Sequence, residues 1–511
     1  MKPTDISAPD YFHKVVDCQW ACPAHTPVPE YIRLIAEGRY SDAYMINWKS
    51  NVFPGILGRT CDRPCEPACR RGRVEDNPVA ICRLKRVAAD FKDDISQRLP
   101  RPAAKNGKRI ALVGGGPASL AVARDLAPLG YHCTVFDGDP KAGGMMRSQI
   151  PKFRLPDSVI DEETGYILGL GVEFKGGQRI DSLKQLLAEN YDAIFVGSGA
   201  PRGRELDIPG RTFKHVAGKL IGVTFQKVKA EYDAKGRRNL VPSGEPDETV
   251  PCDDVLVAVG QENAFPWIEA DCGIEFDKWH MPKVDPKTFV STNPKVFFGG
   301  DAAFGPKNII WAVAHGHDAA LSIHKMISGE DINERPLPEV HVSSQKMGIH
   351  EWSYDNDISA DKRFKVPHRD KVIALKDIRA EVELGYDVKL ALGEAQRCLN
   401  CDVQTVFSAP LCIECDACVD ICPMDCITFT ENGEEDDLRQ RLKAPSPHHD
   451  QALYVSGDLK TGRVMVKDED VCLHCGLCAE RCPTGAWDMQ KYLIDMVHAG
   501  STCQSKARSA A

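Results

Sequence analysis

The sequence has no long hydrophobic run and no long basic run. No stretch of about 18 uninterrupted apolar residues occurs, so no segment is predicted to span a bilayer. The first residues, MKPTDISAPDYFHK, are polar and acidic and lack the apolar core of a secretory signal. The net charge of −9, without a basic cluster, argues against a broad nucleic-acid footprint. These absences predict a cytoplasmic protein that binds neither membranes nor nucleic acid.

Cysteine, by contrast, is abundant, with 21 residues in a chain of 511. In a short secreted protein, so many cysteines would indicate a disulfide framework. Here the chain is long, has no export signal, and places its cysteines two or three residues apart, which favours metal binding in a reducing compartment. Apolar residues make up 43% of the sequence, enough for packed cores, and the length predicts roughly three domains.

Two cysteine runs near the C-terminus share the pattern C-x2-C-x2-C-x3-C-P, namely CIECDACVDICP at 412–423 and CLHCGLCAERCP at 472–483. This pattern is typical of bacterial two-cluster ferredoxins, in which the fourth cysteine of each run binds the other cluster. The predicted ligands of one [4Fe-4S] cluster are Cys412, Cys415, Cys418 and Cys482; those of the other are Cys472, Cys475, Cys478 and Cys422. A zinc ribbon is the alternative, but paired CxxC knuckles would suffice for it, without four cysteines and a proline in each run.

The N-terminal region has six further clustered cysteines, two fewer than a pair of cubane clusters requires. They are Cys18, Cys22, Cys61, Cys65, Cys69 and Cys82. Far along the chain, EAQRCLNCDV holds an isolated pair, Cys398 and Cys401, which cannot close a four-thiolate site alone. We therefore predict that this pair folds back onto the N-terminal domain. The alternatives are an unpaired surface CxxC or a small redox dithiol.

The segment KRIALVGGGPASLAVARDLAPLGYHCTVFD predicts a strand, a glycine-rich turn, a helix and a second strand that ends in an acidic residue. Gly114 permits the tight turn, and Gly116 lets backbone amides approach a pyrophosphate at the helix N-terminus. Ser119 stands where a third glycine is usual, and its small side chain can still pack helix on strand. Asp137 is placed to bind an adenosine ribose. The pattern indicates a dinucleotide site, for either FAD or NAD.

A family resemblance supports both interpretations. The stretch GRTCDRPCEPACRRGRVEDNPVAI resembles the N-terminal iron–sulfur domain of the glutamate synthase small subunit and of dihydropyrimidine dehydrogenase. In that family an RCLxC element directly precedes CxxxCP, whereas here RCLNC stands at 397–401 and CxxxCP at 18–23. The resemblance implies one cluster held by Cys398, Cys401, Cys18 and Cys69, and another held by Cys22, Cys61, Cys65 and Cys82. Cys82 is the ligand that the family varies.

Three later segments resemble the flavin elements of the same family, in the same order. KAGGMMRSQIPKFRLP contributes Gly143, Gly144 and Arg154, and YDAIFVGSGA centres on Gly199. VFFGGDAAFGPKNIIWAVAHGHDAA contains Asp301, which by resemblance contacts the ribityl–pyrophosphate region, while the following helix points at the isoalloxazine. This order favours FAD over NAD. His315 and His317 lie in that last segment and are expected either to tune the flavin or to be ordinary packed histidines.

The family's second dinucleotide-binding domain, for NAD(P)H, has no evident counterpart. Its glycine motif is expected after DIPG at 207–210, but no second GxGxxG occurs, and 211–260 is too short to hold such a domain. Either this nucleotide site has been lost, or a segment is missing from the sequence. Whether NAD(P) binds therefore remains open at the level of sequence.

Nearly the whole chain resembles the flavin–iron–sulfur subunit of anaerobic 2-oxoacid oxidoreductase complexes. That resemblance implies catalytic partners containing thiamine diphosphate, with electrons passing through four [4Fe-4S] clusters and FAD to NAD(P) or ferredoxin. The redox chemistry belongs to the cofactors, so no catalytic acid, base or nucleophile is predicted. The alternatives are a self-standing NAD(P)H:ferredoxin-type oxidoreductase and, outside the enzymes, a zinc-stabilised scaffold.

The predicted fold is an α/β FAD-binding Rossmann-like domain flanked by an N-terminal α-helical iron–sulfur domain and a C-terminal α+β bacterial-ferredoxin domain. Apolar strands (RIALVGGG, HCTVFD, YDAIFVGSG, DDVLVAVG, KVFFGG) alternate with helical stretches in the central part, and KVIALKDIRAEVELG has helical potential. The expected boundaries are 1–100 for the N-terminal domain, 101–330 for the FAD domain, 331–405 for a linker with the returning CxxC, 406–500 for the ferredoxin domain and 501–511 for a tail. The remaining cysteines, expected to be free thiols, are Cys133, Cys252, Cys272, Cys426 and Cys503.

Overall fold

The computed structural model describes most of the chain. It covers residues 1–8, 11, 16–204, 214–216, 219–234, 236–353, 356–446 and 449–501. The chain divides into two compact units, Met1–Gly199 with Phe265–Ala511, and Ala200–Ala264. Among the described helices, none combines the length and the apolar character that crossing a membrane would require.

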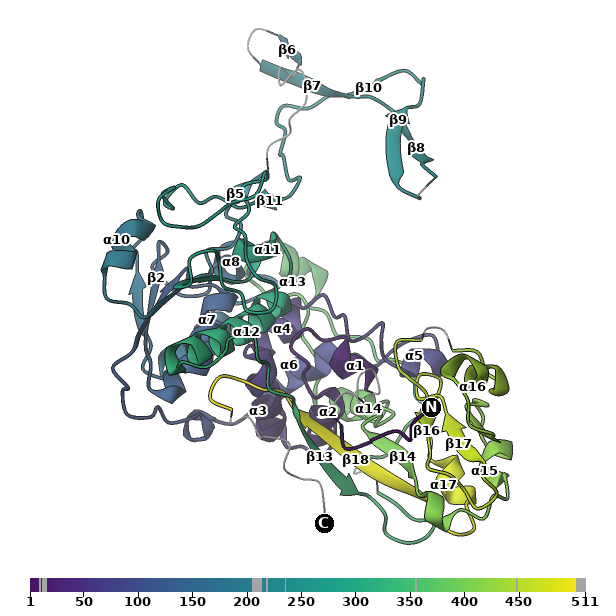
Figure 1. Cartoon of the computed structure of the whole chain (residues 1–511). Coiled ribbons are helices and arrows are strands. Elements are labelled where there is room, and N and C mark those ends of the chain that lie inside the picture. The colour runs from purple at the N-terminus through teal and green to yellow at the C-terminus, as the bar shows by residue number, and fades with distance from the viewer. Residues whose placement is uncertain are drawn as a thin grey trace. The chain divides into compact units, whose positions relative to one another are not determined.

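The larger unit contains a five-stranded parallel sheet, of which β2 is labelled at the left in Figure 1. Its strands, in spatial order, are β12 (Val296–Phe298), β4 (Ala193–Val196), β1 (Arg109–Val113), β2 (His132–Asp137) and β3 (Glu173–Gly176). Four of the five predicted strands are among them. Strands β1, β4 and β12 are mostly apolar because both faces of a parallel sheet are buried, whereas the edge strand β3 is partly exposed and carries Glu173 and Lys175. The Rossmann-like α/β fold expected from the sequence is therefore confirmed.

Two helices of this domain lie against each other at close range. They are α7 (Pro117–Leu126), which follows the glycine-rich turn, and α12 (Ile309–Ser328), which follows β12 and the short helix α11 (Asp301–Phe304). A Cβ atom at Gly316 would lie 2.6 Å from the carbonyl oxygen of Ala118, so only glycine permits this approach. The contact fixes α12 relative to the glycine-rich turn.

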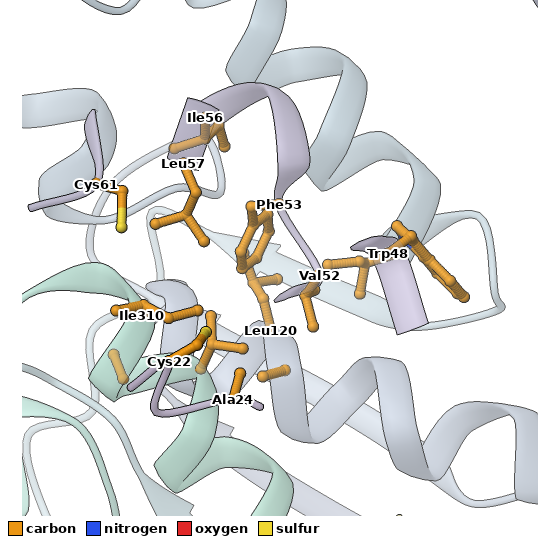
Figure 2. Packing of buried hydrophobic residues seen from close by; sticks show 14 of the residues in the cluster. Cys22, Ala24, Trp48, Val52, Phe53, Ile56, Leu57, Cys61, Leu120 and Ile310 are labelled. Atoms are coloured by element: carbon orange, nitrogen blue, oxygen red, sulfur yellow. The ribbon is translucent and has the colours of Figure 1, made fainter. Parts of the chain in front are cut away.

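The N-terminal region is helical, as predicted. Its helices are α1 (Asp17–Trp20), α2 (Val28–Ala36), α3 (Tyr40–Asn51), α4 (Pro54–Thr60), α5 (Arg71–Val74) and α6 (Ile81–Phe91). They share one hydrophobic core with the Rossmann-like domain, and Figure 2 shows Phe53 and Cys22 packed in the same cluster as Leu120 and Ile310. From α9 (Asp157–Leu168), the buried carboxylate of Glu163 accepts hydrogen bonds from the amides of Gly55 and Ile56 at the start of α4.

The C-terminal domain has two three-stranded antiparallel sheets. One consists of β15 (Ile427–Thr430), β17 (Val464–Lys467) and β16 (Tyr454–Val455). The other consists of β13 (Glu339–Ser344), β18 (Trp487–Asp495) and β14 (Val403–Phe407). The helices α15 (Ala417–Asp420) and α17 (Leu477–Arg481) lie within the two cysteine runs, and α16 (Glu435–Arg441) lies between the runs. Strand β13 and the first residues of β14 come from the expected linker at 331–405, so this segment contributes to the sheet that contains β18.

Between these strands, α14 (Val388–Ala395) packs against α2 and α6 of the N-terminal region. The RCLNC element follows α14 directly, and β14 begins two residues after Cys401. One short stretch of chain therefore runs from the N-terminal helices into the ferredoxin sheet.

Two expectations about local structure are wrong. The segment DDVLVAVG at 253–260 is not a strand, because no described strand pairs with it and an extended segment without a neighbour gains no ladder hydrogen bonds. KVIALKDIRAEVELG is helical only in α13 (Lys371–Lys376). Beyond it, the amide of Leu384 donates to the Pro367 carbonyl and the amide of Arg369 to that of Val382, so backbone pairing replaces the helix.

The smaller unit consists of short strands. They are β5 (Arg202–Gly203), β6 (Lys214–Val216), β7 (Lys219–Phe225), β8 (Val228–Tyr232), β9 (Arg238–Pro242), β10 (Glu248–Val250) and β11 (Gln261–Glu262). DIPG at 207–210, after which a nucleotide-binding insertion was expected, lies outside the described residues.

Candidate cofactor sites

The two ferredoxin-type runs place their thiols around two separate cavities. Cys412, Cys415, Cys418 and Cys482 line one cavity, beside Trp487. Cys422, Cys472, Cys475 and Cys478 line the other. In each cavity three cysteines come from one run and the fourth comes from the other run. The grouping matches the crossed sets expected from the sequence.

Cys426 is a fifth thiol in the second cavity. Its Sγ atom lies 3.5 Å from the Sγ of Cys422, and the side chain is buried. The sequence pattern leaves Cys426 out of the ligand set, and the first cavity has Ala486 at the corresponding position, four residues after its own C-P cysteine. An alanine is thus already accommodated at this place in the fold.

We expect Cys426→Ala to leave the iron content unchanged and Cys478→Ala to remove about four irons per chain, the content of one cubane cluster. Four thiolates satisfy a cluster, so the fifth thiol contributes packing and a weak S–H donor. Iron analysis and EPR spectra of the two purified variants provide the comparison. Loss of iron in Cys426→Ala would show that Cys426, rather than Cys422, is a ligand.

The isolated cysteine pair lies inside the N-terminal region. Cys398 and Cys401 are only 7% and 9% exposed, and they line one cavity together with Cys18 and Cys69. The alternative of a surface CxxC is therefore wrong. Burial raises the pKa of Cys398 to about 12, so its thiol keeps its proton at neutral pH unless a metal replaces it.

The other four N-terminal cysteines also meet. Cys82 lies near enough to Cys61 and Cys65 to influence the pKa of both thiols. Cys82 lowers the pKa of Cys65, but burial, with a smaller contribution from Cys22, raises it on balance. Cys82, which the resemblance leaves least certain, thus lies among the others. It is completely buried at the start of α6.

A buried lysine, Lys85, lies beside the thiol set formed by Cys22, Cys61, Cys65 and Cys82. Lys85 is 3% exposed, and the pKa of its ammonium group is raised chiefly by Cys82 and Cys61 against the cost of burial. No described carboxylate forms an ion pair with it, although buried charges are normally paired. Four thiols around one ammonium group fit an anionic iron–sulfur cluster. The sequence could have indicated Lys85, because it follows Cys82 by three residues on the same face of a helix.

The second ferredoxin cavity has a similar cation. Lys467 is 1% exposed, and Cys472 and Glu469 raise its pKa. Its ammonium group donates to Thr405 Oγ1 at 2.8 Å and lies 3.0 Å from Glu469 Oε1. Strand β17 carries this lysine toward the cavity, a placement that the cysteine spacing alone could not reveal.

Glycine-rich turns meet at the N-terminus of α7 and form a cradle. Gly114 has φ +97°, and the amide of Gly143 donates to the Gly115 carbonyl at 2.8 Å. The Ser119 hydroxyl is buried, and a Cβ atom at Gly197 would lie 2.4 Å from its oxygen. The small residue at 119 therefore packs α7 onto the end of β4, as the sequence predicted. Free amides at the start of α7 make the cradle suitable for a pyrophosphate.

The other residues predicted to contact the dinucleotide differ in their position and exposure. Asp137, at the end of β2, accepts hydrogen bonds from the amides of Gly115 and Asp139. Burial raises the pKa of Asp137 and of Asp301, and Asp301 begins α11. Gly116 is the N-cap residue of α7, and Gly144 is the N-cap residue of α8 (Met145–Ser148). Gly199 follows β4 and has a positive φ angle. Arg154 is exposed in the turn before α9.

His315 and His317, both in α12, are packed side chains. His315 lies among Phe289, Phe304 and Trp311, and burial lowers its pKa to about 4. The ring nitrogens of His317 lie 2.6 Å from an Asp125 carboxylate oxygen and 2.9 Å from the Ser50 carbonyl oxygen. Of the cysteines expected to be free, Cys133 and Cys272 are buried away from these cavities, Cys252 lies in the smaller unit, and Cys503 lies outside the described residues.

Three family models match parts of the chain. Dihydropyrimidine dehydrogenase domain II, 4Fe-4S cluster, matches residues 12–96; NAD(P)-binding Rossmann-like domain matches 112–171; and 4Fe-4S dicluster domain matches 411–486. The chain therefore has an N-terminal 4Fe-4S domain, a Rossmann-like domain and a C-terminal dicluster domain. Together these domains define an iron–sulfur oxidoreductase.

Curated relatives agree with this class. The β subunit of the NADP(+)-dependent formate dehydrogenase of Moorella thermoacetica is 28% identical over 503 residues, covering 75% of this chain and 70% of the relative. The β subunit of the NADPH-Fe(3+) oxidoreductase of Geobacter sulfurreducens is 26% identical over 531 residues, covering 78% and 77%. The small chain of glutamate synthase [NADPH] of Mycobacterium tuberculosis is 36% identical over 202 residues, covering 39% and 41%. The relatives are thus oxidoreductase subunits of the glutamate synthase small-chain type.

Proposed function

We propose that this chain is the electron-transfer subunit of an oxidoreductase complex and that it holds four [4Fe-4S] clusters and FAD. The proposal assigns the thiol sets described above as the cluster ligands and the glycine cradle as the FAD site. When bound, the clusters exchange single electrons, and the flavin exchanges one or two. The observation that carries the proposal is the burial of Cys398 and Cys401 with Cys18 and Cys69, which completes a fourth thiol set.

The arrangement of the sets supports transfer in a fixed order. The two ferredoxin sets exchange their fourth cysteines, so they are neighbours. Cys18 and Cys22 belong to different N-terminal sets: Cys18 lies in the single-turn helix α1, and Cys22 directly follows its C-cap residue, Ala21. Next to Cys61, the Asp62 carboxylate accepts a hydrogen bond of 2.5 Å from Asn308, the N-cap of α12. The Cys61 set is therefore the one beside the flavin segment.

A missing nucleotide domain favours a relay over a self-standing NAD(P)H enzyme. The alignment with the formate dehydrogenase subunit spans 503 residues but covers only 75% of this chain, so the relative has residues with no counterpart here. This gap fits the absence of a second glycine motif. The alternative, an NAD(P)H:ferredoxin-type oxidoreductase, requires a nucleotide site that would have to be supplied elsewhere.

The catalytic partner that we propose is a thiamine-diphosphate-dependent 2-oxoacid oxidoreductase, with NAD(P) or ferredoxin as the other electron carrier. This assignment rests on the sequence resemblance. The curated relatives named above belong to a formate dehydrogenase and to an NADPH-Fe(3+) oxidoreductase, so the native complex has to be tested with both classes of electron donor.

The test is anaerobic purification of the native complex with metal, flavin and subunit analysis. We expect about sixteen irons per chain, the sum for four cubane clusters, together with one FAD and reduction by a 2-oxoacid. If formate rather than a 2-oxoacid reduces the complex, the proposed catalytic partner is wrong, but the proposed electron-transfer function of this chain stands. Zinc in place of iron would overturn the function and select a scaffold, and flavin reduction by NADH or NADPH in the isolated chain would select the self-standing enzyme.

A further inference from the structure

His474 lies at a buried junction between the ferredoxin domain and the N-terminal domain. It stands between two thiols of the second ferredoxin set, and it is 1% exposed. Its backbone amide donates to Cys472 Sγ at 3.3 Å. Its Nδ1 atom lies 3.0 Å from the carbonyl oxygen of Cys401, and because a carbonyl can only accept, Nδ1 carries the proton. One residue therefore contacts a cysteine of each thiol set.

Arg70 forms a second link across the same junction. It directly follows Cys69 in the chain and is 1% exposed. Its guanidinium group donates to the carbonyl of Cys472, lies 3.2 Å from His474 Nε2 and pairs with Asp17. The Glu469 carboxylate lies 3.4 Å from the same Nε2 atom, so the guanidinium group and this carboxylate together hold the imidazole between Cys472 and Cys401.

The first ferredoxin run has the same backbone position as His474, but its side chain makes different contacts. Glu414 occupies the place of His474 in CIEC, with φ +55° against +56°, and its amide donates to Cys412 Sγ at the same 3.3 Å. Its carboxylate, however, accepts hydrogen bonds from Thr461 and Arg463 within the ferredoxin domain. The two backbones match, and only the histidine reaches the N-terminal thiol set.

We propose that His474, positioned by Arg70, is the bridge for electron transfer between the Cys472 set and the Cys18 set. The inference rests on the proposed function. In each transfer one electron leaves the group held by one set, which is oxidised, and reaches the group held by the other, which is reduced. No covalent bond forms or breaks, and no proton changes place.

The test compares His474→Leu, His474→Asn and the matched control Glu414→Leu in the full chain reconstituted with iron, sulfide and FAD. Iron content and EPR spectra first show that each variant contains its clusters. The ferredoxin domain is then reduced by a short pulse, and the rate of electron equilibration with the N-terminal clusters is measured. We expect a rate roughly 10–100-fold lower in His474→Leu, by analogy with the loss of affinity or activity when an outer-shell partner of a metal ligand is removed.

Two readouts separate a bridge from simple packing. Asparagine can return an N–H donor to the Cys401 carbonyl, so His474→Asn should recover most of the rate, while Glu414→Leu should match wild type. The midpoint potential of the Cys18-set cluster should shift in His474→Leu and return in His474→Asn. A wild-type rate in an iron-complete His474→Leu overturns the bridge.

If His474→Leu fails to assemble its clusters, Arg70→Gln carries the test, and a wild-type rate in that variant overturns the bridge. The proposed function fails separately, when the wild-type chain itself binds zinc or shows no electron equilibration at all. Normal equilibration in wild type with no effect of the His474 substitutions leaves the relay standing and removes only the bridge.

Discussion

Replacing both Cys398 and Cys401 by alanine is expected to remove about four of about sixteen irons per chain and to interrupt electron flow from the ferredoxin domain to the flavin. The pair supplies two of the four thiols around its cavity, and two remaining thiols cannot hold a cubane cluster. Iron analysis, flavin content and EPR spectra of the anaerobically purified chain measure the first effect. Pulse reduction of the ferredoxin domain, followed at the flavin absorbance, measures the second.

The matched control is the double variant Cys133→Ala, Cys272→Ala. These thiols are equally buried but line none of the three described thiol cavities. The control should retain its iron and its electron flow. If the Cys398 and Cys401 variant keeps the wild-type iron content, this pair does not bind a cluster, and the fourth thiol set is assigned wrongly. Retained FAD in that variant would show that the Rossmann-like domain remains folded.

The number of N-terminal cysteines made it possible to predict from the sequence that Cys398 and Cys401 fold back onto the N-terminal domain. Clusters require thiolates in fixed numbers, and the six N-terminal cysteines leave a deficit of two, which the isolated pair Cys398 and Cys401 matches. Hydrophobic patterning likewise predicted four strands of the parallel sheet, because most of their residues are buried on both faces and therefore apolar. The sequence therefore predicts those features in which burial requires apolar residues or a cluster requires a fixed number of cysteines.

Features created by contact between distant segments were not predictable in this way. Arg70 reaches the Cys472 carbonyl, and Lys467 reaches Thr405, only because segments far apart in the chain meet there. In the sequence, His474 cannot be told from any other residue inside a CxxC spacing. The apolar segment at 253–260 fits a strand pattern but finds no described strand to pair with. After α13, pairing between Pro367 and Leu384 overrides local helix propensity.

Replacing Arg397 by methionine is expected to have the largest effect on stability. Arg397 and Glu394 are both 0% exposed, and Nη1 of the arginine lies 2.6 Å from Oε1 of the glutamate. The guanidinium group also donates to the carbonyls of Pro78, Asn77 and Asp361. Removing one partner of a buried ion pair typically costs about 3–5 kcal/mol, because the other charge stays buried without compensation.

The same change should release the segment that holds Cys398. Glu394 accepts hydrogen bonds from the amides of Ala80 and Phe364, so the ion pair joins α14 to the start of α6 and to the linker. Loss of the arginine therefore weakens the contact that keeps Cys398 and Cys401 beside Cys18. Urea titration followed by bleaching of the cluster absorbance reports both the loss of stability and the release of iron.

A double-mutant cycle distinguishes the ion pair from general packing. Arg397→Met with Glu394→Met removes both charges, so it should be less destabilised than Arg397→Met alone. Arg39→Met is the exposed control, since the Arg39 side chain is 55% exposed and its pairs with Glu37 and Asp42 should contribute only about 0–1 kcal/mol. If Arg397→Met changes the urea midpoint no more than Arg39→Met does, the buried pair does not hold the RCLNC segment in place, and packing of α14 against α2 must do so instead.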